Sequence, residues 1–436
     1  MVLAGGDAVK KITAHSPENW RACPQCGFIS TLPKTELTLV AACPRCHSVL
    51  WRMRRHPFEV AMACGLSGVL FYWSVLVAPF LEISAYGRFQ QANIATGPTQ
   101  LINEGFEFVG FLVLAVTVIF PGVKLGILLT TLIGIETRLV SKRFLRALFR
   151  WYAPISPWAM IDVYLLGLLV AYTRLTALAS VHLDTALFGL IGLMVSMAAT
   201  DATLDAEAVW RTLDQKKDDD KHLPDANRKA ELIGCRSCEL VNLAAPGTPC
   251  RRCSTILHRY KVDSVSRTWA LLIAAVFFYV PANVYPVMTI TQLGTDTPYT
   301  ILGGIKELLD AGMWPLALLV FCASMVIPLM KIITLGYLLI QTQLHNGSHL
   351  LGRTIAYKIV MYIGRWSMID VFMISILVAL LRFAQFTNVR AEIGAPCFAS
   401  VVVLTMFAAE FFDPKLMWNA KNFLMKTGGF LKRKHA

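Results

Sequence analysis

Eight of the eleven cysteines in this 436-residue chain stand in four Cys-x-x-Cys motifs. They form two sets of four: Cys23, Cys26, Cys43 and Cys46, then Cys235, Cys238, Cys250 and Cys253. One such turn presents two thiolates to a metal ion, and a second turn completes a tetrahedral site. We therefore predict two structural zinc ions per chain. A rubredoxin-like iron centre is the alternative, because four thiolates suit both metals.

The cysteine spacing argues against other uses of these thiols. Four thiolate ligands leave no open coordination position, which argues against catalytic zinc. A thioredoxin-like redox motif needs a βαβ setting, and none is readable around the four motifs. Disulfides would be disfavoured in a reducing cytoplasm.

A second group of reactive residues lies in segments of the chain that are strongly apolar. Lys331 falls within such a segment and Asp370 opens the next, where an unpaired charge costs several kcal/mol. Ser324 precedes Lys331 by two helical turns, Ser367 precedes Asp370 by one turn, and Thr405 lies in the last apolar segment. We predict that these five residues form a buried polar cluster. It is either a transport or proton route or a purely structural Lys–Asp pair.

The first half of the chain carries an echo of this cluster in Thr117, Lys124 and Asp162. Pro121 follows Thr117 by four residues, as Pro328 follows Ser324. Each proline therefore leaves a main-chain carbonyl without its helical hydrogen bond.

The two clusters are unequal in polar side chains. The first half has Ala159 where the second has Ser367, and Met197 where the second has Thr405. Only the second half has the run Pro281–Pro286, whose prolines and Asn283 are expected to break a helix. We therefore expect the working site in the second half.

These correspondences reveal an internal duplication. Pro121-Gly-Val-Lys124 matches Pro328-Leu-Met-Lys331, and Trp158-Ala-Met-Ile-Asp162-Val matches Trp366-Ser-Met-Ile-Asp370-Val. A four-cysteine set precedes each copy. The chain is thus two tandem repeats of one unit.

Composition places both repeats in a bilayer. Hydrophobic residues make up 56% of the chain and the mean hydropathy is +0.55. We predict eight transmembrane helices: Phe58–Phe80, Phe106–Leu132, Trp158–Arg174, Leu187–Thr200, Trp269–Pro286, Trp314–Leu339, Ser367–Arg382 and Val401–Phe412. The fourth and eighth are short, so a re-entrant segment or an extension into less apolar flanks is the alternative. The expected fold is an all-α polytopic membrane protein with four helices per repeat.

The distribution of Lys and Arg predicts the orientation. Basic residues crowd the segments that flank the cysteine modules and are sparse in the loops at 81–105, 178–186, 288–313 and 383–396. By the positive-inside rule, both termini and both modules face the cytoplasm. Residues 1–20 lack the apolar core of a secretory signal. Four helices per repeat give both repeats the same orientation.

The predicted domains follow from this layout. They are a first zinc-ribbon-like module at 1–56, a first membrane module at 57–205, a linker with the second zinc-ribbon-like module at 206–265, a second membrane module at 266–413, and a basic tail at 414–436.

The net charge of +13 points to a membrane surface. Arg138, Lys142, Arg146 and Arg150 stand four residues apart, as a basic stripe on a juxtamembrane helix. We interpret the stripe as a contact for anionic phospholipid headgroups. Nucleic acid is not an expected partner, since no recognisable nucleic-acid-binding module accompanies the charge.

Three stretches of the second half resemble the paraquat-inducible protein A family: VPANVYP, VIPLMK and GRWSMIDVF. The likeness covers nearly the whole chain. It implies tetraspanin-like membrane modules in the bacterial inner membrane and a periplasmic partner whose MCE domains form a lipid tunnel. It also implies that Ser324, Lys331, Asp370 and Thr405 belong to an intramembrane polar network.

The function implied by this resemblance is the loading or receiving of phospholipid at such a tunnel. The chain is not expected to be an enzyme, and it lacks the GxxxxGK[ST] loop of ATPases. Proton-coupled and passive transfer both remain compatible with the residues. Two other functions are kept as alternatives: a scaffold that anchors the tunnel without handling lipid, and a membrane redox protein with thiolate-bound iron.

Overall fold

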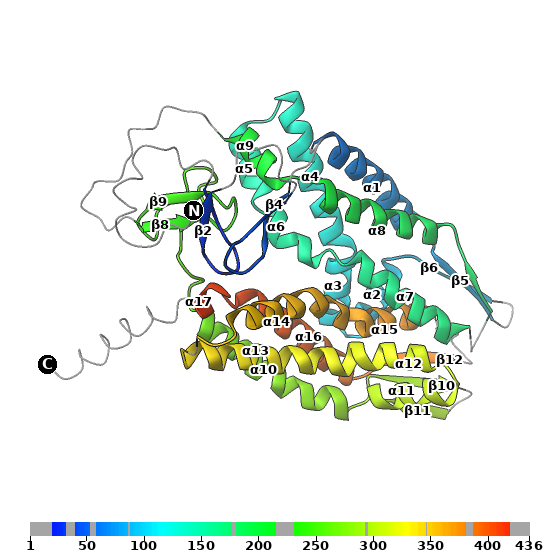
Figure 1. Ribbon diagram of the computed structural model, residues 1–436. Coiled ribbons are helices and arrows are strands. Elements are labelled where there is room, and N and C mark those ends of the chain that lie inside the picture. Colours follow the sequence, from blue (N-terminus) through cyan, green and yellow to red (C-terminus); the bar gives the residue numbers. More distant parts are fainter. Residues whose placement is uncertain are drawn as a thin grey trace.

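Eight apolar helical spans dominate the structure, a computed structural model that describes residues 20–31, 40–52, 58–85, 88–176, 180–214, 231–292, 295–345, 347–380 and 387–418. The spans are Glu59–Val77, Glu107–Thr137, Lys142–Thr173, Ala186–Thr203, Ser264–Val284, Trp314–Gln343, Leu350–Leu380 and Gly394–Phe411. Each is long and apolar enough to cross a membrane, and they pack into one bundle (Figure 1). The predicted eight-helix architecture is confirmed.

The first half has four spans and short connecting elements. In chain order these are α1 (Glu59–Val77), β5 (Leu81–Ala85), β6 (Arg88–Ala92), α2 (Thr96–Asn103), α3 (Glu107–Leu114), a π-helical turn (Ala115–Ile119), α4 (Phe120–Thr137), α5 (Lys142–Phe149), α6 (Tyr152–Ile155), a 3-10 turn (Ser156–Trp158), α7 (Ile161–Leu175), β7 (Ser180–Leu183), α8 (Ala186–Thr203) and α9 (Ala206–Leu213).

The second half repeats this order. Its elements are α10 (Ser264–Val284), β10 (Met288–Gln292), β11 (Thr295–Tyr299), α11 (Ile301–Asp310), α12 (Trp314–Phe321), a π-helical turn (Cys322–Val326), α13 (Ile327–Gln343), α14 (Leu350–Ile363), a 3-10 turn (Gly364–Met368), α15 (Ile369–Leu380), β12 (Thr387–Ala391), α16 (Gly394–Phe411) and α17 (Lys415–Trp418).

Each half closes one end of its helices with a three-stranded antiparallel sheet. The strand orders are β6-β5-β7 and β11-β10-β12, again a repeat. Both sheets lie at one end of the bundle and the cysteine modules lie at the other (Figure 1). We call these the sheet end and the cysteine end.

The short fourth and eighth spans are complete helices. α8 and α16 each have 18 residues, because both extend beyond the predicted ranges into less apolar flanks. The fifth span also differs in detail from the expectation. α10 continues through Pro281 and ends at Val284, where the Asn283 side chain donates to the carbonyl of Tyr279 at 2.7 Å.

Proline shapes the second span of each half. Pro121 and Pro328 stand in the first turn of α4 and α13, directly after the two π-helical turns. A proline cannot donate to the preceding turn, and the wider π turn accommodates this local loss. Thr117 and Ser324 lie inside these turns, so the backbone irregularity coincides with the polar residues in both halves.

The two halves meet along α15. All twelve residues of this helix are buried, as its almost uniformly apolar sequence requires. It packs against α7 and α2 of the first half. Two glycines permit the close approach: a Cβ at Gly97 would lie 2.6 Å from the carbonyl oxygen of Ser375, and one at Gly167 would lie 2.9 Å from the Cβ of Phe372.

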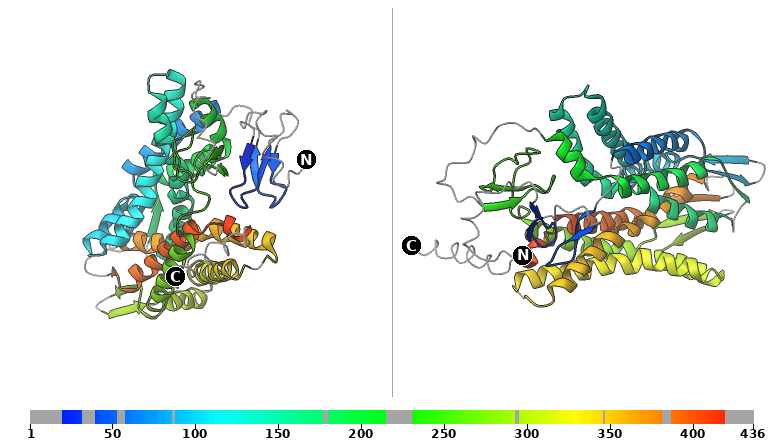
Figure 2. Two further views of the ribbon diagram at one scale, coloured as in Figure 1. Left: turned by 90° about the vertical axis from the view of Figure 1, so that its left-hand side faces the viewer. Right: turned by 45° about the horizontal axis from the view of Figure 1, so that its top comes forward.

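The cysteine modules are pairs of turns on short β-hairpins. The first contains β1 (Trp20–Ala22) with β2 (Ile29–Thr31) and β3 (Val40–Ala42) with β4 (Val49–Arg52). The second contains β8 (Glu231–Gly234) with β9 (Val241–Ala244), and a bridge between Pro249 and Ile256. Two further views show both modules at the same end of the helices (Figure 2).

Candidate functional site

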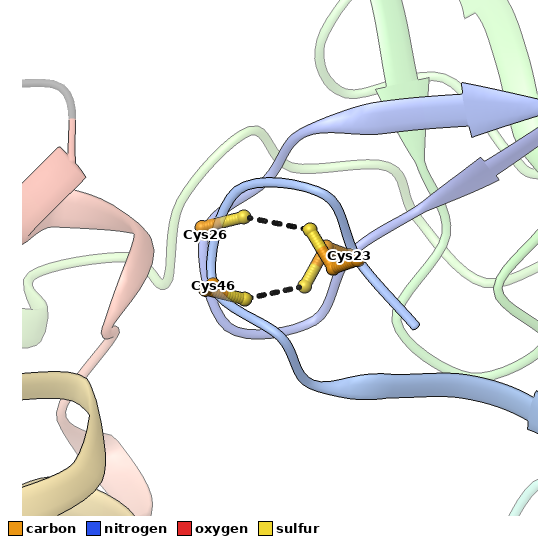
Figure 3. A group of neighbouring side chains, drawn as sticks. Cys23, Cys26 and Cys46 are labelled. Atoms are coloured by element: carbon orange, nitrogen blue, oxygen red, sulfur yellow. Dashed lines mark hydrogen bonds between the residues drawn. The ribbon is translucent and has the colours of Figure 1, made fainter. Parts of the chain in front are cut away.

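The structure brings each predicted set of four cysteines together. The four Sγ atoms of each set lie within 4.8 Å of one another, and all eight side chains are buried. Cys23 and Cys46 have their sulfurs 3.4 Å apart, and Figure 3 shows these two with Cys26 directed into one cluster. The corresponding distance between Cys235 and Cys253 is also 3.4 Å. Zn–S bonds of about 2.3 Å would place tetrahedral sulfurs roughly 3.8 Å apart.

Backbone geometry explains why the sulfurs converge. The residue after the last cysteine of every turn has a positive φ: Gly27, His47, Glu239 and Ser254. This left-handed residue reverses the chain, so that the N–H of His47 donates to the carbonyl of Cys43 at 2.9 Å. The same bond joins Ser254 to Cys250 at 3.0 Å.

Hydrogen bonding within each cluster lowers the pKa of some thiols and raises that of others. Hydrogen bonding with the Cys26 side chain lowers the pKa of Cys23 to about 5. Hydrogen bonds with Cys235 and Cys238 likewise lower the pKa of Cys250 to about 6. All eight cysteines are free thiols, which fits metal ligation and not disulfides. The donor set therefore suits two tetrahedral metal ions.

In the second membrane half, Ser324 and Asp370 are in contact. The Ser324 hydroxyl bonds the Asp370 carboxylate and also donates to the carbonyl of Val320 at 2.6 Å. Both residues are almost completely buried. A hydroxyl has one proton, so it can donate to only one of these two acceptors at a time.

Lys331 makes a separate set of contacts. Its Nζ donates to the carbonyl of Gly364 at 3.2 Å and to Ser367 Oγ at 3.1 Å. The ion pairs among the described residues do not include one between Lys331 and Asp370. The predicted cluster is thus divided in two, with Ser324 and Asp370 in one part and Lys331 and Ser367 in the other.

Thr405 is buried in α16 and donates to the carbonyl of Val402 at 2.9 Å. Its hydroxyl satisfies its own helix and does not bond the other members of the predicted cluster.

A small cavity reaches Asp370 from the sheet end. It has a volume of about 30 Å³ and is lined by Asp370, Met373 and Ile374 of α15, by Phe398 and Val320, and by residues 287, 288, 299–301 and 304. That volume is enough for about one water molecule. The cavity therefore connects the Asp370 side of the cluster, and not Lys331, to the region of β10, β11 and α11.

The first half connects its lysine differently. Lys124 Nζ forms an ion pair with Asp201 Oδ2 at 2.7 Å, and the Tyr152 hydroxyl donates to Asp201 Oδ1 at 2.9 Å. Thr117 donates to the carbonyl of Val113 at 2.8 Å, within its own helix. Asp162 is half-buried, and the ion pairs found among the described residues do not join it to Lys124.

Sequence reasoning missed Asp201 and Tyr152. Asp201 stands in the last turn of α8, just beyond the predicted fourth span, and the equivalent residue of α16 is Ala409. The available signal was the difference in charge between the repeats at this position, with an aspartate in the first and an alanine in the second.

The predicted basic stripe has a second use. Lys142 donates to the carbonyl of Thr212 at 3.4 Å, and Arg146 to the carbonyl of Arg252 at 3.1 Å. These two residues connect α5 to α9 and to the second cysteine module, so the stripe is not free as a whole to bind headgroups.

Comparison with known proteins extends over both membrane halves. The sequence profile of the family described as paraquat-inducible protein A matches residues 58–214 and 265–422. The intermembrane transport protein PqiA of Escherichia coli K12 is 29% identical over 405 residues, covering 91% of this chain and 95% of that protein. The lipophilic envelope-spanning tunnel protein A of the same organism is 28% identical, covering 92% of both chains. A probable intermembrane transport protein of Haemophilus influenzae is 25% identical, covering 91% and 95%. No solved structure matches the chain.

Proposed function

Because this chain belongs to the paraquat-inducible protein A family, we propose that it moves lipid between membranes as the inner-membrane subunit of a transport system. Two relatives that cover almost the whole chain are named for intermembrane transport and for a lipophilic envelope-spanning tunnel. The expected partner is a periplasmic MCE-domain tunnel protein, to which this chain passes phospholipid or from which it accepts it. The role is transport, and no catalytic reaction is proposed.

One observation carries the proposal beyond the family name. A membrane-embedded carboxylate, Asp370, lines a small cavity together with residues of β10, β11 and α11 from the sheet end. A buried ionisable residue of this kind is costly and typically marks a transport or proton route. The sheet end would face the periplasm and the partner, and the cysteine end with both termini would face the cytoplasm.

The geometry also suggests an energy source. A proton on Asp370 would let the carboxyl donate to Ser324 while Ser324 donates to Val320, whereas an ionised Asp370 would accept from Ser324. Protonation would therefore reorganise contacts between the π-helical turn and α15. We propose that this exchange is coupled to lipid movement, and that the two metal ions are structural zinc.

Site-specific photocrosslinking tests lipid handling. A benzophenone amino acid at Ile374, in the cavity lining, is expected to label phospholipid when the partner is present, and Asp370→Asn should abolish this labelling. The same probe at Phe277, an exposed lipid-facing residue, is the control, because its labelling should not depend on Asp370. A pure scaffold would give equal labelling at Ile374 with and without the substitution while still capturing the partner, which would contradict the proposal.

A further inference from the structure

Two short helices occupy equivalent places after the fourth span of each half. α9 follows α8 and contains Trp210, and α17 follows α16 and contains Trp418. Trp210 is part of the hydrophobic cluster that includes the second set of cysteines. Trp418 packs against the first set, and its indole N–H donates to Thr354 of α14 at 3.1 Å. If the chain is taken as a circle, each module thus rests on the short helix that directly precedes it.

An arginine in the same motif position completes each docking. Arg45 and Arg252 both precede the last cysteine of their module. The Arg45 guanidinium lies 4.7 Å from the ring centre of Trp418 and donates to its carbonyl at 3.4 Å. Arg252 bonds Glu207 of α9 at 3.1 Å and Asp214 at 3.1 Å. The duplication therefore extends to the way in which the modules are held.

Glu207 connects both modules to the first membrane half. Its carboxylate forms ion pairs with Arg21 of the first module, Arg252 of the second and Arg211 of its own helix. The side chains of Arg21 and Arg252 are almost fully buried, so these charges depend on Glu207 for compensation. Burial acts to lower the pKa of Arg252, but the combined attraction of Glu207, Cys238 and Asp214 raises it.

Asp413 makes a comparable set of contacts in the second half, although its equivalent in the first half is Asp205. Asp413 follows α16 and accepts from Arg236 of the second module at 2.7 Å. It also accepts from the main-chain N–H of Lys261 at 2.8 Å and from that of Lys415 at 3.1 Å. Asp413 is buried, and its contacts join a module, the start of α10 and α17.

The modules also contact each other. Arg21 forms a β-bridge with Leu240, and β1 packs against β8 and β9. A continuous set of contacts therefore runs from the first half through Glu207, across both modules, to Asp413 and Trp418 in the second half.

We propose that Glu207 and Asp413 are positioning residues that act through the cysteine modules to hold the two membrane halves in a fixed relation. Within the membrane the halves meet along α15. The modules add a second connection at the cysteine end, and this brace determines how far the halves can move relative to one another during lipid transfer. The link between this brace and lipid transfer rests on the proposed function.

Hydrogen exchange on the purified, metal-loaded full chain tests the brace itself. Glu207→Gln is expected to increase amide exchange at least threefold in both β1 and β9, although the substitution lies in α9. Asp413→Asn should increase exchange at 261–264 and also in the first module. The control Glu231→Gln breaks an exposed pair with Arg259 within one module and should leave the other module unchanged. Effects confined to the substituted turn would overturn the brace.

Lipid transfer measured with a double variant tests the positioning role. Each single substitution is expected to lower transfer about fivefold, and the double variant should be close to fivefold as well, because either change opens the same brace. A loss near the product, about 25-fold, would show two independent effects and contradict the proposal. Arg236→Gln replaces Asp413→Asn if the latter does not fold, since it keeps the Asp413 contacts with Lys261 and Lys415. Absence of transfer in the unsubstituted protein would refute the proposed function and leave the exchange result standing.

Discussion

The two membrane halves share the same order of elements but place their charges differently. In the first half, Lys124 is paired with Asp201 from α8. In the second half, the hydrogen bonds of Lys331 to described residues go to the neutral oxygens of Gly364 and Ser367, and the carboxylate of Asp370 bonds Ser324. One copy therefore holds a compensated ion pair, and the other holds a lysine and an aspartate that are separately hydrogen-bonded.

We interpret this difference as a separation of structural and transport roles between the two halves after the duplication. A lysine paired with a carboxylate stabilises the packing of α4 and α8 and has little freedom to change its protonation. Separated ionisable groups cost stability unless some function retains them. The comparison supports our proposal that the second half carries the transport site and that the first half has a structural role.

The largest expected effect is on transport after removal of one carboxylate. Asp370→Asn should reduce lipid transfer or rescue of an envelope-defect strain by about 100-fold or more, because it removes a proton acceptor at the cavity. Asp162→Asn, the matched change in the first half, should have an effect of less than about threefold, because Asp162 is only half-buried and the cation of that half, Lys124, pairs with Asp201. Rescue is measured at matched membrane levels of the proteins. Equal losses of rescue from Asp370→Asn and Asp162→Asn would contradict the comparison.

The next effect concerns the cysteine modules. Metal analysis should find two zinc ions per chain, and the paired change Cys235→Ser with Cys238→Ser should leave one. This change should lower the membrane level several-fold, because the second module shares a large core with the first half, including Trp210 and Leu213. One metal ion or none in metal-replete protein would contradict the assignment.

The matched change in the first module should be milder. Cys23→Ser with Cys26→Ser should also remove one zinc ion but reduce the membrane level less, since that cluster packs only with Phe28, Leu50 and Trp418 among the described residues. Visible absorbance of thiolate-bound iron would instead favour the iron alternative. Equal membrane levels in the two paired variants would show that module packing is not the cause.

A smaller effect is expected where the halves meet. Gly97→Ala should lower the free energy of unfolding by about 1–3 kcal/mol, because its new Cβ would meet the Ser375 backbone of α15. Gly126→Ala in α4 is the control, since a Cβ there meets no atom within 4 Å, and it should be neutral or stabilising by up to about 1 kcal/mol. Thermal unfolding in detergent measures both variants. A destabilisation by Gly126→Ala as large as that by Gly97→Ala would argue against the α2–α15 contact.

The smallest expected effect is on stability. It discriminates well, because replacing the lysine should change stability in opposite directions in the two halves. Lys331→Met should be neutral or raise stability by about 1 kcal/mol, since it removes a buried cation that lacks a carboxylate partner among the described residues. Lys124→Met should lower stability by about 1 kcal/mol, because Asp201 is left without its cation and is only partly exposed to solvent. A second change, Asp201→Asn, should restore most of that loss. If thermal unfolding shows that both Lys→Met changes lower stability, or that both raise it, the contrast between the two lysines is refuted.

The sequence was sufficient for the architecture because membrane helices depend on local properties. Length, hydropathy and the Cys-x-x-Cys spacing predict the eight spans and both thiolate clusters without knowledge of how the helices pack. The duplication also drew attention to Ser324 and Asp370, which the structure brings into contact. These features require only residues that are close in the chain or repeated in it.

The partners of the charges could not be predicted in the same way. Whether Lys331 reaches Asp370 or Ser367 depends on how α13 and the 3-10 turn at 364–368 are rotated against each other. The pairing of Lys124 with Asp201 depends on an aspartate at the edge of a span; its absence from the second repeat marks the position as different but does not identify its partner. The docking of the modules on α9 and α17 joins residues of opposite halves, which neither hydropathy nor spacing encodes.

The contact of the first module with α17 has a consequence for the biogenesis of the protein. Arg45 docks on Trp418, a residue 373 positions later in the chain. At a synthesis rate of about 5–20 residues per second, the first module leaves the ribosome about 20–75 s before its supporting helix exists. During that interval the module must keep its four cysteines together without α17, while all eight spans are inserted. Completion of the cysteine end is therefore the final step of assembly, and a chain truncated before Trp418 would leave the first module without this contact.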